Sequence, residues 1–593
     1  MNAKNPIVGC SFLLNPTGTE RIFTPEEFNA DQRGFAQGVV DFMQREIMPF
    51  AERLEHQEEG LMVEKLKKAG EAGLLMIDVP EEYGGLGLDK TTSMLCAEKM
   101  ATYASFSVSQ GAHTGIGSMP LMYFGNAEQK ERYLPRLATG EILAAYALTE
   151  PGSGSDALGA RTTAVLTEKD GKRFYKLNGT KMWITNAGFA DLFTVFAKVN
   201  GEKFTAFLVE RTYEGVSTGA EEKKMGIKGS STRMLILEDV MVPEENVLGE
   251  IGRGHKIAFN ILNIGRFKLG VGVLGGGKHA LTVSTRYAQE RKQFDTPIVE
   301  FGAIRQKLAD MTTQLYALES MCYRVAGYMD ELIDSLDGQA PDYIQKMMDA
   351  VEEFTVEDSI MKVFGSETVS FVVDEAVQIH GGYGFSQEYE VERAYRDSRI
   401  NRIFEGTNEI NRMLIPGSIL KRAMKGDLPL FQLVGAVDAA IEAPKATLPT
   451  SADGPLALEV FLAGQIKHLA VYCTNLAIQK HMADLKDQQE LLLALADLAI
   501  AAYGVDCTVA RVLQRIQVKD SSVHVALARI FAVERYQQAV GIAQRLLPFL
   551  AEGDDLVARF AALDKFTFAV PTNTIALKRV VADHTVEMAD WNL

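Results

Sequence analysis

Apolar residues recur at spacings of three and four near the start of the chain, for instance at Phe35, Val39 and Phe42. This spacing matches the turn of an α-helix and predicts an N-terminal helical domain over residues 1–145. Gly and Pro are frequent in residues 79–89, which predicts a connection between helices there.

The period of the apolar pattern changes to two between residues 146 and 255, which predicts a central β-barrel or β-sandwich domain. The pair Asn178-Gly179 is typical of a hairpin turn, so we expect the chain to reverse there. Alternate side chains of a strand share one face, so Trp183 and Thr185 are expected to project together.

Helical spacing returns over residues 256–428 and predicts a second helical bundle. Four prolines cluster in residues 429–455, which predicts an exposed linker. Apolar positions then recur at Leu462, Ile466 and Leu469, so residues 456–593 are expected to form a further helical domain. The predicted fold class is therefore α+β and mainly α.

Composition and charge exclude several classes of protein. The chain has 593 residues, with 61 Lys and Arg against 78 Asp and Glu, and the net charge of −17 argues against nucleic acid as a partner. The five cysteines show no C-x-x-C spacing, which favours a reducing compartment. No leader is visible, and the apolar stretch 491–505 is short for a membrane span, so we expect a cytoplasmic protein.

None of three common functional motifs is predicted to be a functional site here. Gly270-x-Gly272-x-x-Gly275 matches a dinucleotide-binding fingerprint, but it lies in a helical stretch without the required preceding strand, and we expect these glycines to serve helix packing. Gly152-Ser-Gly-Ser155 does not match the nucleophile motif of hydrolases. The nine histidines show no metal-ligand spacing, so no metal site is predicted.

Two segments carry candidate chemistry. The glycine-rich loop that begins at Tyr146 and the pair Trp183 and Thr185 could hold a flat polar ligand, although a buried tryptophan in a β core is an equal alternative. Glu405 lies between Phe404 and Gly406, and an apolar setting would raise its pKa as a general base requires. The alternative is that Glu405 caps a helix or pairs with a neighbouring arginine.

Five motifs in order resemble the acyl-CoA dehydrogenase family: TEPGSGSD (149–156), KMWITNAG (181–188), ERKQF (290–294), QIHGGYGF (378–385) and RIFEGTNEI (402–410). The resemblance covers about residues 30–425. Within the family the chain is similar to the very-long-chain branch, which shares GAHTGIG (111–117), EKKMGIK (222–228), the segment 262–267 and an extra C-terminal helical domain.

The resemblance implies an FAD-dependent enzyme in which Glu405 removes the α-proton of a fatty acyl-CoA, yielding a trans-2-enoyl-CoA. It implies electron-transfer flavoprotein as the electron acceptor and at least a homodimer, because FAD would lie across a subunit interface. The residues that would bind FAD are Tyr146, Leu148, Thr149, Ser155, Trp183, Thr185, Arg291, Gln293, Phe294, Gln378, Gly382, Thr407 and Glu409. The residues that would border the substrate are Ser155, Asn263, Arg266, Phe404 and Gly406.

Several questions stay open from the sequence. The small residues Gly111, Ala112, Gly115 and Gly117 could deepen the acyl pocket for long chains, or they could serve helix packing. The same family motifs also suit an acyl-CoA oxidase, or a non-catalytic docking protein. The C-terminal helices could contact a membrane surface or form an internal core.

Overall fold

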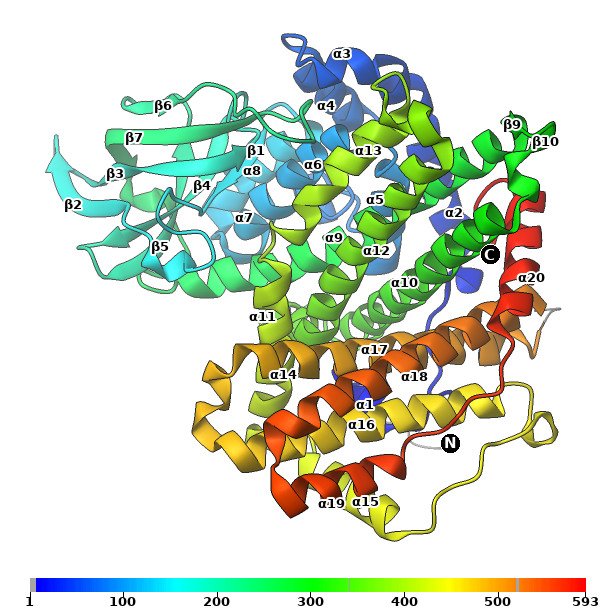
Figure 1. Ribbon diagram of the computed structural model, residues 1–593. Coiled ribbons are helices and arrows are strands. Elements are labelled where there is room, and N and C mark those ends of the chain that lie inside the picture. The colour runs from blue at the N-terminus through cyan, green and yellow to red at the C-terminus, as the bar shows by residue number, and fades with distance from the viewer. Residues whose placement is uncertain (1–6, 341, 519–521) are drawn as a thin grey trace.

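A computed structural model describes residues 7–340, 342–518 and 522–593. Figure 1 shows an N-terminal helical domain, a β domain at one side, a second helical domain and a group of C-terminal helices beneath it. The mainly α, α+β fold class predicted from the sequence is confirmed.

The N-terminal domain is helical, as its apolar period predicts. Two of its helices begin at capping boxes, in which the side chain of the N-cap residue (Asn29 or Asn126) and a glutamine three residues later satisfy each other's backbone N–H groups. The elements are α1 (Ser11–Leu14), α2 (Ala30–Phe42), α3 (Ala51–Glu55), α4 (Leu61–Glu71), α5 (Lys90–Met100), α6 (Ala104–Gly111), the π-helical turn η5 (Ala112–Gly117), α7 (Met119–Phe124) and α8 (Ala127–Thr139).

The β domain is an eight-stranded sheet in the order β6-β7-β3-β2-β4-β5-β8, and β1 pairs in parallel with β4. β4 is buried along nearly its whole length, so it lies at the centre of this domain. The strands are β1 (Ala144–Ala147), β2 (Thr163–Lys169), β3 (Lys172–Thr185), β4 (Leu192–Val199), β5 (Lys203–Glu210), β6 (Val216–Thr218), β7 (Thr232–Pro243) and β8 (Val247–Leu248).

The predicted hairpin turn at Asn178-Gly179 is wrong. β3 runs through both residues, and the chain reverses at Asp170-Gly171, where both φ angles are positive (53° and 71°) as a tight hairpin turn requires. Asn178 instead lies at an irregularity in the β3–β7 pairing, where its side-chain amide donates to Asp239 at 2.9 Å. The Asn-Gly pair suits a bulge as well as a turn, and the pairing with β7 decides between them.

The second helical domain is built around two long helices, α9 and α12. Gly270 and Gly275 lie inside α9, as expected. A Cβ at Gly270 would lie 3.1 Å from that of Met361 in α12, and one at Gly275 would overlap a carbonyl oxygen of α5. Gly270 and Gly275 therefore pack helices. At Gly272 a Cβ would meet nothing within 4 Å, so the expected packing role is wrong for that residue. The elements are α9 (Gly254–Glu290), β9 (Lys292–Gln293), β10 (Thr296–Pro297), α10 (Gly302–Asp334), α11 (Tyr343–Glu352), α12 (Thr355–His380), η9 (Gly381–Phe385), α13 (Glu390–Ser398), η10 (Arg399–Arg402) and α14 (Asn408–Lys425).

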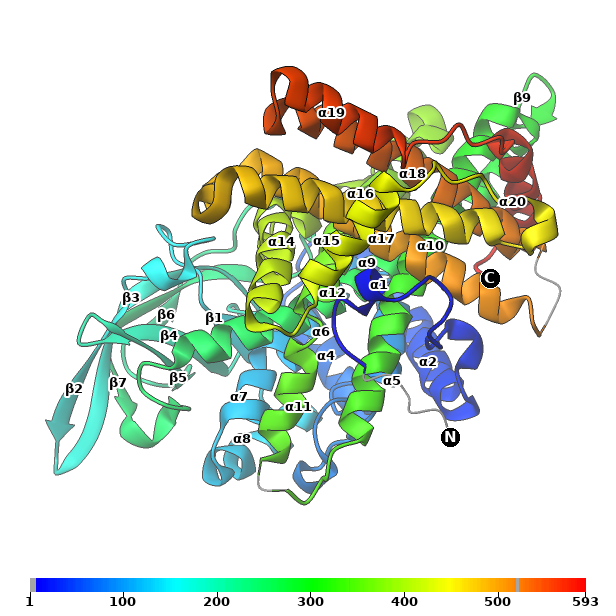
Figure 2. The same ribbon diagram turned by 90° about the horizontal axis from the view of Figure 1, so that it is seen from below.

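The C-terminal helices form a layer across the second helical domain (Figure 2). The stripe Leu462, Ile466 and Leu469 is fully buried, so the predicted amphipathic helix is confirmed. The predicted linker differs from the structure, because residues 430–442 form a helix that buries Val437. The helices are α15 (Leu430–Glu442), α16 (Ala457–His481), α17 (Gln489–Arg515), α18 (Ser522–Leu550), α19 (Gly553–Asp564) and α20 (Thr574–Met588).

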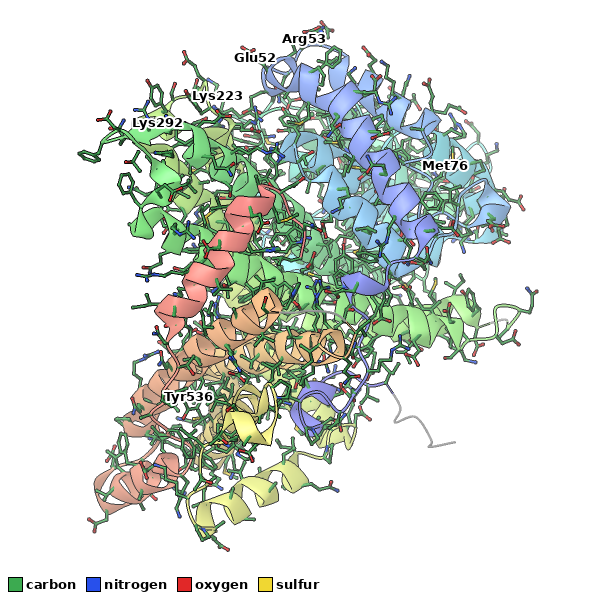
Figure 3. The ribbon with its side chains drawn as sticks, turned by 90° about the vertical axis from the view of Figure 1, so that its right-hand side faces the viewer. Glu52, Arg53, Met76, Lys223, Lys292 and Tyr536 are labelled. Carbon is green, nitrogen blue, oxygen red and sulfur yellow. The ribbon has the colours of Figure 1, made fainter. Side chains whose placement is uncertain are left out.

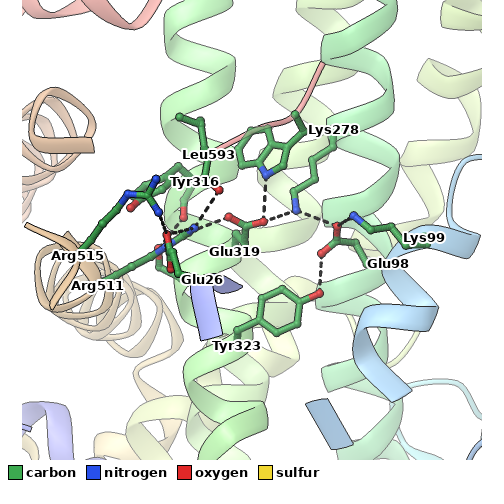
Figure 4. A network of polar contacts seen from close by, with 12 residues as sticks. Glu26, Glu98, Lys99, Lys278, Tyr316, Glu319, Tyr323, Arg511, Arg515 and Leu593 are labelled. Carbon is green, nitrogen blue, oxygen red and sulfur yellow. Dashed lines mark hydrogen bonds and ion pairs between the residues drawn. The ribbon is translucent and has the colours of Figure 1, made fainter. Parts of the chain in front are cut away.

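A buried network of charges ties this layer to the other helical domains (Figure 4). Lys278 of α9 pairs with Glu98 of α5 at 2.8 Å and with Glu319 of α10. Arg511 of α17 pairs with Glu319 at 2.7 Å and with Glu26 at 3.0 Å. Removal of one partner of a buried pair leaves an uncompensated charge, so the network makes the relative placement of these helices specific.

In the part of the chain that the structure describes, two helices, α9 and α17, are long and apolar enough to cross a membrane by length and composition. In the most apolar window of each, 61% of the residues of α9 and 83% of those of α17 are buried inside the fold. Both therefore serve here as core helices.

Candidate active site

A cavity of about 270 Å³ lies against α5, α6, α9 and α13. Residues of α9 line this cavity at helical spacing from Ile261 to Val283. Residues of the segment from Glu390 to Glu405 also line it, and this segment runs in the opposite direction to α9. Gly265 lies against Glu405 at one end, and His279 bonds Glu390 at the other. The helical rise separates Gly265 from His279 by about 21 Å. We call this cavity the channel.

Glu405 occupies a turn between η10 and α14 that is unusual for its residue type. Its φ is +56°, and Gly406 follows with φ +79°. A side chain rarely adopts this left-handed region unless the surroundings hold it there. The carboxylate lies over Gly265, where an added Cβ would come within 2.5 Å of Oε2. The lack of a side chain at position 265 therefore makes room for Glu405.

Three side chains hold this turn through its backbone oxygens. Lys362 Nζ donates to the Gly406 carbonyl at 2.6 Å, and Asn411 Nδ2 donates to the same oxygen at 2.9 Å. Arg266 Nε donates to the Glu405 carbonyl at 3.3 Å. These bonds compensate for the strained backbone and direct the carboxylate into the channel.

The environment of Glu405 suits a base. The residue is half-buried, but its Oε2 is inaccessible to solvent and has no hydrogen-bond partner among the described residues. Burial raises the pKa of Glu405 to about 7, against the opposing effect of the positive charges of Arg266 and Lys362. A carboxylate with a pKa near neutrality can accept a proton from a weak carbon acid far better than an ordinary glutamate.

The alternative roles considered for Glu405 are wrong. Thr407, rather than Glu405, caps α14 by accepting a hydrogen bond from the Ile410 N–H at 3.2 Å. The arginines that could have paired with Glu405 are Arg396, Arg399 and Arg402. Within the described part of the chain none of them forms an ion pair with it, and Arg396 pairs with Glu392 at 2.6 Å.

Trp183 is exposed rather than buried, so the alternative of a β-core tryptophan is wrong. Its side chain is 54% exposed, and its φ of +61° turns it out of the regular strand pattern. Thr185, two residues later, lines the channel. Trp183 itself is not among the residues that line the channel, but an exposed indole two residues from its wall can serve as a stacking surface for a flat ring.

The next group of expected flavin contacts lies in β1 and in the loop that follows it. The hydroxyl of Tyr146, in β1, is buried and has no hydrogen-bond partner among the described residues; burial first, and the charge of Glu405 second, raise the pKa of this hydroxyl. Ser155 is exposed. The carbonyls of Leu148 and Thr149 accept hydrogen bonds from Lys181 (3.2 Å) and from the Met182 N–H (2.8 Å).

The other expected FAD contacts lie in two separate places. Arg291 lies at the end of α9, beside the hairpin that carries Gln293 and Phe294, and Lys292 of this hairpin lies at the outer edge of the molecule (Figure 3). Gln378 and Gly382 lie next to it, because the Arg291 guanidinium stacks on the ring of Tyr383 at 5.2 Å. Thr407 and Glu409 lie at the start of α14, on the other side of the molecule (Figure 1). One chain does not bring these two groups together.

The expected substrate contacts are only partly at the channel. Phe404 lines the channel, whereas Gly406 does not line it and lies in the turn directly after Glu405. Asn263 accepts a hydrogen bond from Arg266 at 2.8 Å, and neither of these two nor Ser155 lines the channel. Their substrate roles stay predictions, and the structure gives Arg266 a role in supporting the Glu405 turn.

Sequence reasoning missed Lys362 and Asn411. Lys362 is fully buried and lies between apolar residues of α12. A lone lysine on the buried face of an apolar helix was the available signal, since such a charge needs a specific partner. Asn411 lies six residues after Glu405 and carried no comparable signal.

A half-buried carboxylate with a raised pKa at one end of a mainly apolar channel is typical of enzymes that remove a proton from carbon. Sequence models describe the same architecture: the acyl-CoA dehydrogenase N-terminal domain matches residues 29–141, the middle domain 145–240, the C-terminal domain 252–420, and a further C-terminal domain 465–565.

Known proteins are similar to this chain over most of its length. A probable acyl-CoA dehydrogenase of Bacillus subtilis is 48% identical over 97% of this chain and 96% of its own. The very long-chain specific acyl-CoA dehydrogenase of Bos taurus is 38% identical over 83% of this chain and 76% of its own. The crystal structure of an acyl-CoA dehydrogenase from Bacillus anthracis complexed with FAD superimposes with a TM-score of 0.96, at 47% identity, covering 99% of this chain and 100% of its own. The chain belongs to the acyl-CoA dehydrogenase family of flavin oxidoreductases.

Proposed function

We propose that the protein oxidises long-chain fatty acyl-CoA to trans-2-enoyl-CoA, with Glu405 as the base that removes the α-proton and FAD as the cofactor. The observation that carries this proposal is the unpaired carboxylate at the head of a long channel. The buried, unpartnered Tyr146 hydroxyl and the exposed Trp183 indole fit a flat ring with a polar edge beside that carboxylate. When bound there, FAD supplies the acceptor for the hydride that leaves the β-carbon.

The α-proton of a thioester is far less acidic than a carboxylic acid, so the negative charge that develops on the thioester oxygen needs stabilisation. The backbone N–H of Glu405 donates no hydrogen bond within the described part of the chain, and it is available to that oxygen. Bound substrate would also exclude water from Glu405, which keeps the pKa of its carboxyl raised.

The test is anaerobic bleaching of the flavin absorbance by hexadecanoyl-CoA. Glu405→Gln keeps the shape of the side chain but cannot accept the proton, so the bleaching rate should fall by about 10²- to 10⁴-fold. Glu388→Gln, an exposed residue near the start of α13, is the control. Bleaching by Glu405→Gln at the wild-type rate would refute Glu405 as the base.

The preference for long chains rests on the lining of the channel. Gly111, Ala112 and Gly115 line it, and a Cβ at Gly111 would meet nothing within 4 Å. Gly117 is not among the lining residues, and a Cβ there would lie 2.6 Å from the Ala112 carbonyl oxygen, so Gly117 serves close packing. Gly111→Leu should therefore lower kcat/KM for hexadecanoyl-CoA more than for octanoyl-CoA. An equal loss for both substrates would contradict the assignment.

We propose electron-transfer flavoprotein as the electron acceptor, as the family resemblance implies. The rival function is an acyl-CoA oxidase, in which oxygen accepts the electrons. Stoichiometric peroxide release during aerobic turnover would favour the oxidase. Reduction of added electron-transfer flavoprotein without peroxide would support the dehydrogenase.

A homodimer is proposed because the two groups of expected FAD contacts lie apart in one chain. Phe294, in the hairpin formed by β9 and β10, is 90% exposed, as expected for an apolar side chain that a second subunit or its FAD would cover. Mass measurement of the holoenzyme in solution tests this proposal, and a monomer with bound FAD would contradict it.

We propose a cytoplasmic location, with peripheral membrane contact through the C-terminal helices as the further possibility raised by the sequence. Phe431 of α15 and Val557 of α19 are 91% and 69% exposed, which supports such a contact. Co-sedimentation with phospholipid vesicles tests it, with Phe431→Ser as the variant.

A further inference from the structure

The far end of the channel is polar, although most of the channel wall is apolar. His279 and Glu390 meet there at 2.9 Å. Arg393, one turn further along α13, also lines the channel and lies over the ring of Tyr103 at 5.1 Å. The Thr102 hydroxyl beside it is buried without a partner among the described residues. We call these five residues the distal polar site.

Arg393 differs from its neighbour Arg396, which pairs with Glu392 and Glu55. The guanidinium of Arg393 makes no hydrogen bond or close ion pair with the described residues. It lies over the ring of Tyr103, and its charge acts on Glu390 and Asp397. A guanidinium carries five N–H donors. Arg393 therefore presents unused donors at the channel wall.

The charges around Arg393 indicate what these donors could bind. Glu390 and Asp397 lie one turn before and one turn after it on α13. A ligand carboxylate would face both of these acidic side chains, whereas a hydroxyl can accept from Arg393 and donate to Glu390. The arrangement favours a neutral group that both donates and accepts hydrogen bonds.

We propose that the distal polar site binds a hydroxyl group at the far end of the acyl chain, so that long-chain ω-hydroxyacyl-CoA thioesters are substrates. This inference rests on the proposed function, because it uses the same channel and the same base. The α9 rise puts the site about 21 Å from Gly265, and an extended chain advances somewhat less than a carbon–carbon bond of about 1.5 Å per carbon, so roughly 16 carbons reach it.

The experiment compares kcat/KM for 16-hydroxyhexadecanoyl-CoA and hexadecanoyl-CoA, and for 8-hydroxyoctanoyl-CoA and octanoyl-CoA. The hydroxyl of the short chain would stop before the distal polar site. The polar residues Asp78, Ser93 and Lys268 line the channel before that site, but they already bond one another, at 2.8 Å (Ser93 to Asp78) and 2.6 Å (Lys268 to Asp78). A hydroxyl left without a partner there costs about tenfold or more. For each pair we take the ratio of kcat/KM for the hydroxylated thioester to kcat/KM for the unsubstituted one. We expect this ratio to lie within about threefold of one for the long pair and at least about tenfold below one for the short pair.

Two variants test the residues. Arg393→Met and Glu390→Gln should each lower the ratio for the long pair by about tenfold and leave the ratio for the short pair as it was. Arg399→Met, an exposed arginine two turns further along the chain, is the matched control and should change neither ratio.

Three results would overturn the inference. They are a long-pair ratio as low as the short-pair ratio in the wild type, unchanged ratios in both variants, or a preference for the ω-carboxylated chain over the ω-hydroxylated one. Absence of turnover with hexadecanoyl-CoA itself would instead overturn the proposed function, so the two failures are distinguishable.

Discussion

Two glutamates approach α9 at opposite ends of the same channel, and their surroundings differ. Glu390 accepts a hydrogen bond from His279, and that bond is the main cause of its lowered pKa. Glu405 has no such partner at Oε2, and burial raises its pKa to about 7. The same side chain is therefore held ionised at one end and poised to accept a proton at the other, because its partners and solvation decide its proton affinity.

The largest change should come from filling the space under Glu405. Gly265→Ala places a Cβ 2.5 Å from Oε2, so the carboxylate must move. A displacement of about 1 Å can cost roughly 100-fold in kcat. We expect that loss in stopped-flow reduction by hexadecanoyl-CoA. Gly417→Ala, in a helix with nothing within 4 Å of its Cβ, is the control, and a wild-type rate for Gly265→Ala would remove the steric argument.

The pH dependence should report Glu405 and not Glu390. The base must be ionised, and its pKa is raised to about 7, so kcat/KM should rise about tenfold per pH unit below that value and level off above it. Glu390→Gln should leave this inflection where it is, because the lowered pKa of Glu390 keeps it ionised throughout. An inflection that moves with Glu390→Gln would reverse the assignment.

Lys362→Met should shift that inflection to higher pH, because Lys362 lowers the pKa of Glu405. The ionised fraction at neutral pH would fall by roughly fivefold for a shift of about one unit. Loss of the hydrogen bond from Lys362 to the Gly406 carbonyl should also cost about 0.5–1.5 kcal/mol of unfolding free energy, since Asn411 still donates to that oxygen. Lys362→Arg retains the charge and should restore the inflection. A loss of stability without any shift would show a purely structural role.

The smallest effect is expected at the other glutamate. The His279 and Glu390 side chains are 29% and 37% exposed, so His279→Ala should lower the unfolding free energy by less than about 1 kcal/mol. The pKa of Glu390 is lowered in the folded state, so this contribution is present above about pH 4.3, the unfolded value, and is lost as pH falls through the folded value. Denaturant titrations at pH 7 and pH 3 measure it, and a difference that grows at pH 3 would contradict the sign.

Much of the fold followed from local pattern. The change of period from 3.6 to two and back located the β domain between helical domains, and the buried stripe of α16 was predicted residue by residue. The hairpin at Asn178-Gly179 was wrong, since an Asn-Gly pair is compatible with a bulge and only the neighbouring strand β7 decides between the two.

The sequence by itself determined the order of the domains and singled out Glu405, because period and motif are local properties of the chain. Only the tertiary structure decided that Gly265 makes room for that carboxylate and that Lys362 and Asn411 hold its turn. It also decided that a second carboxylate, Glu390, meets α9 at His279, about 21 Å along the helix from Gly265. Burial and charge pairing join residues more than a hundred positions apart, and they set the pKa of a side chain only after the helices have packed.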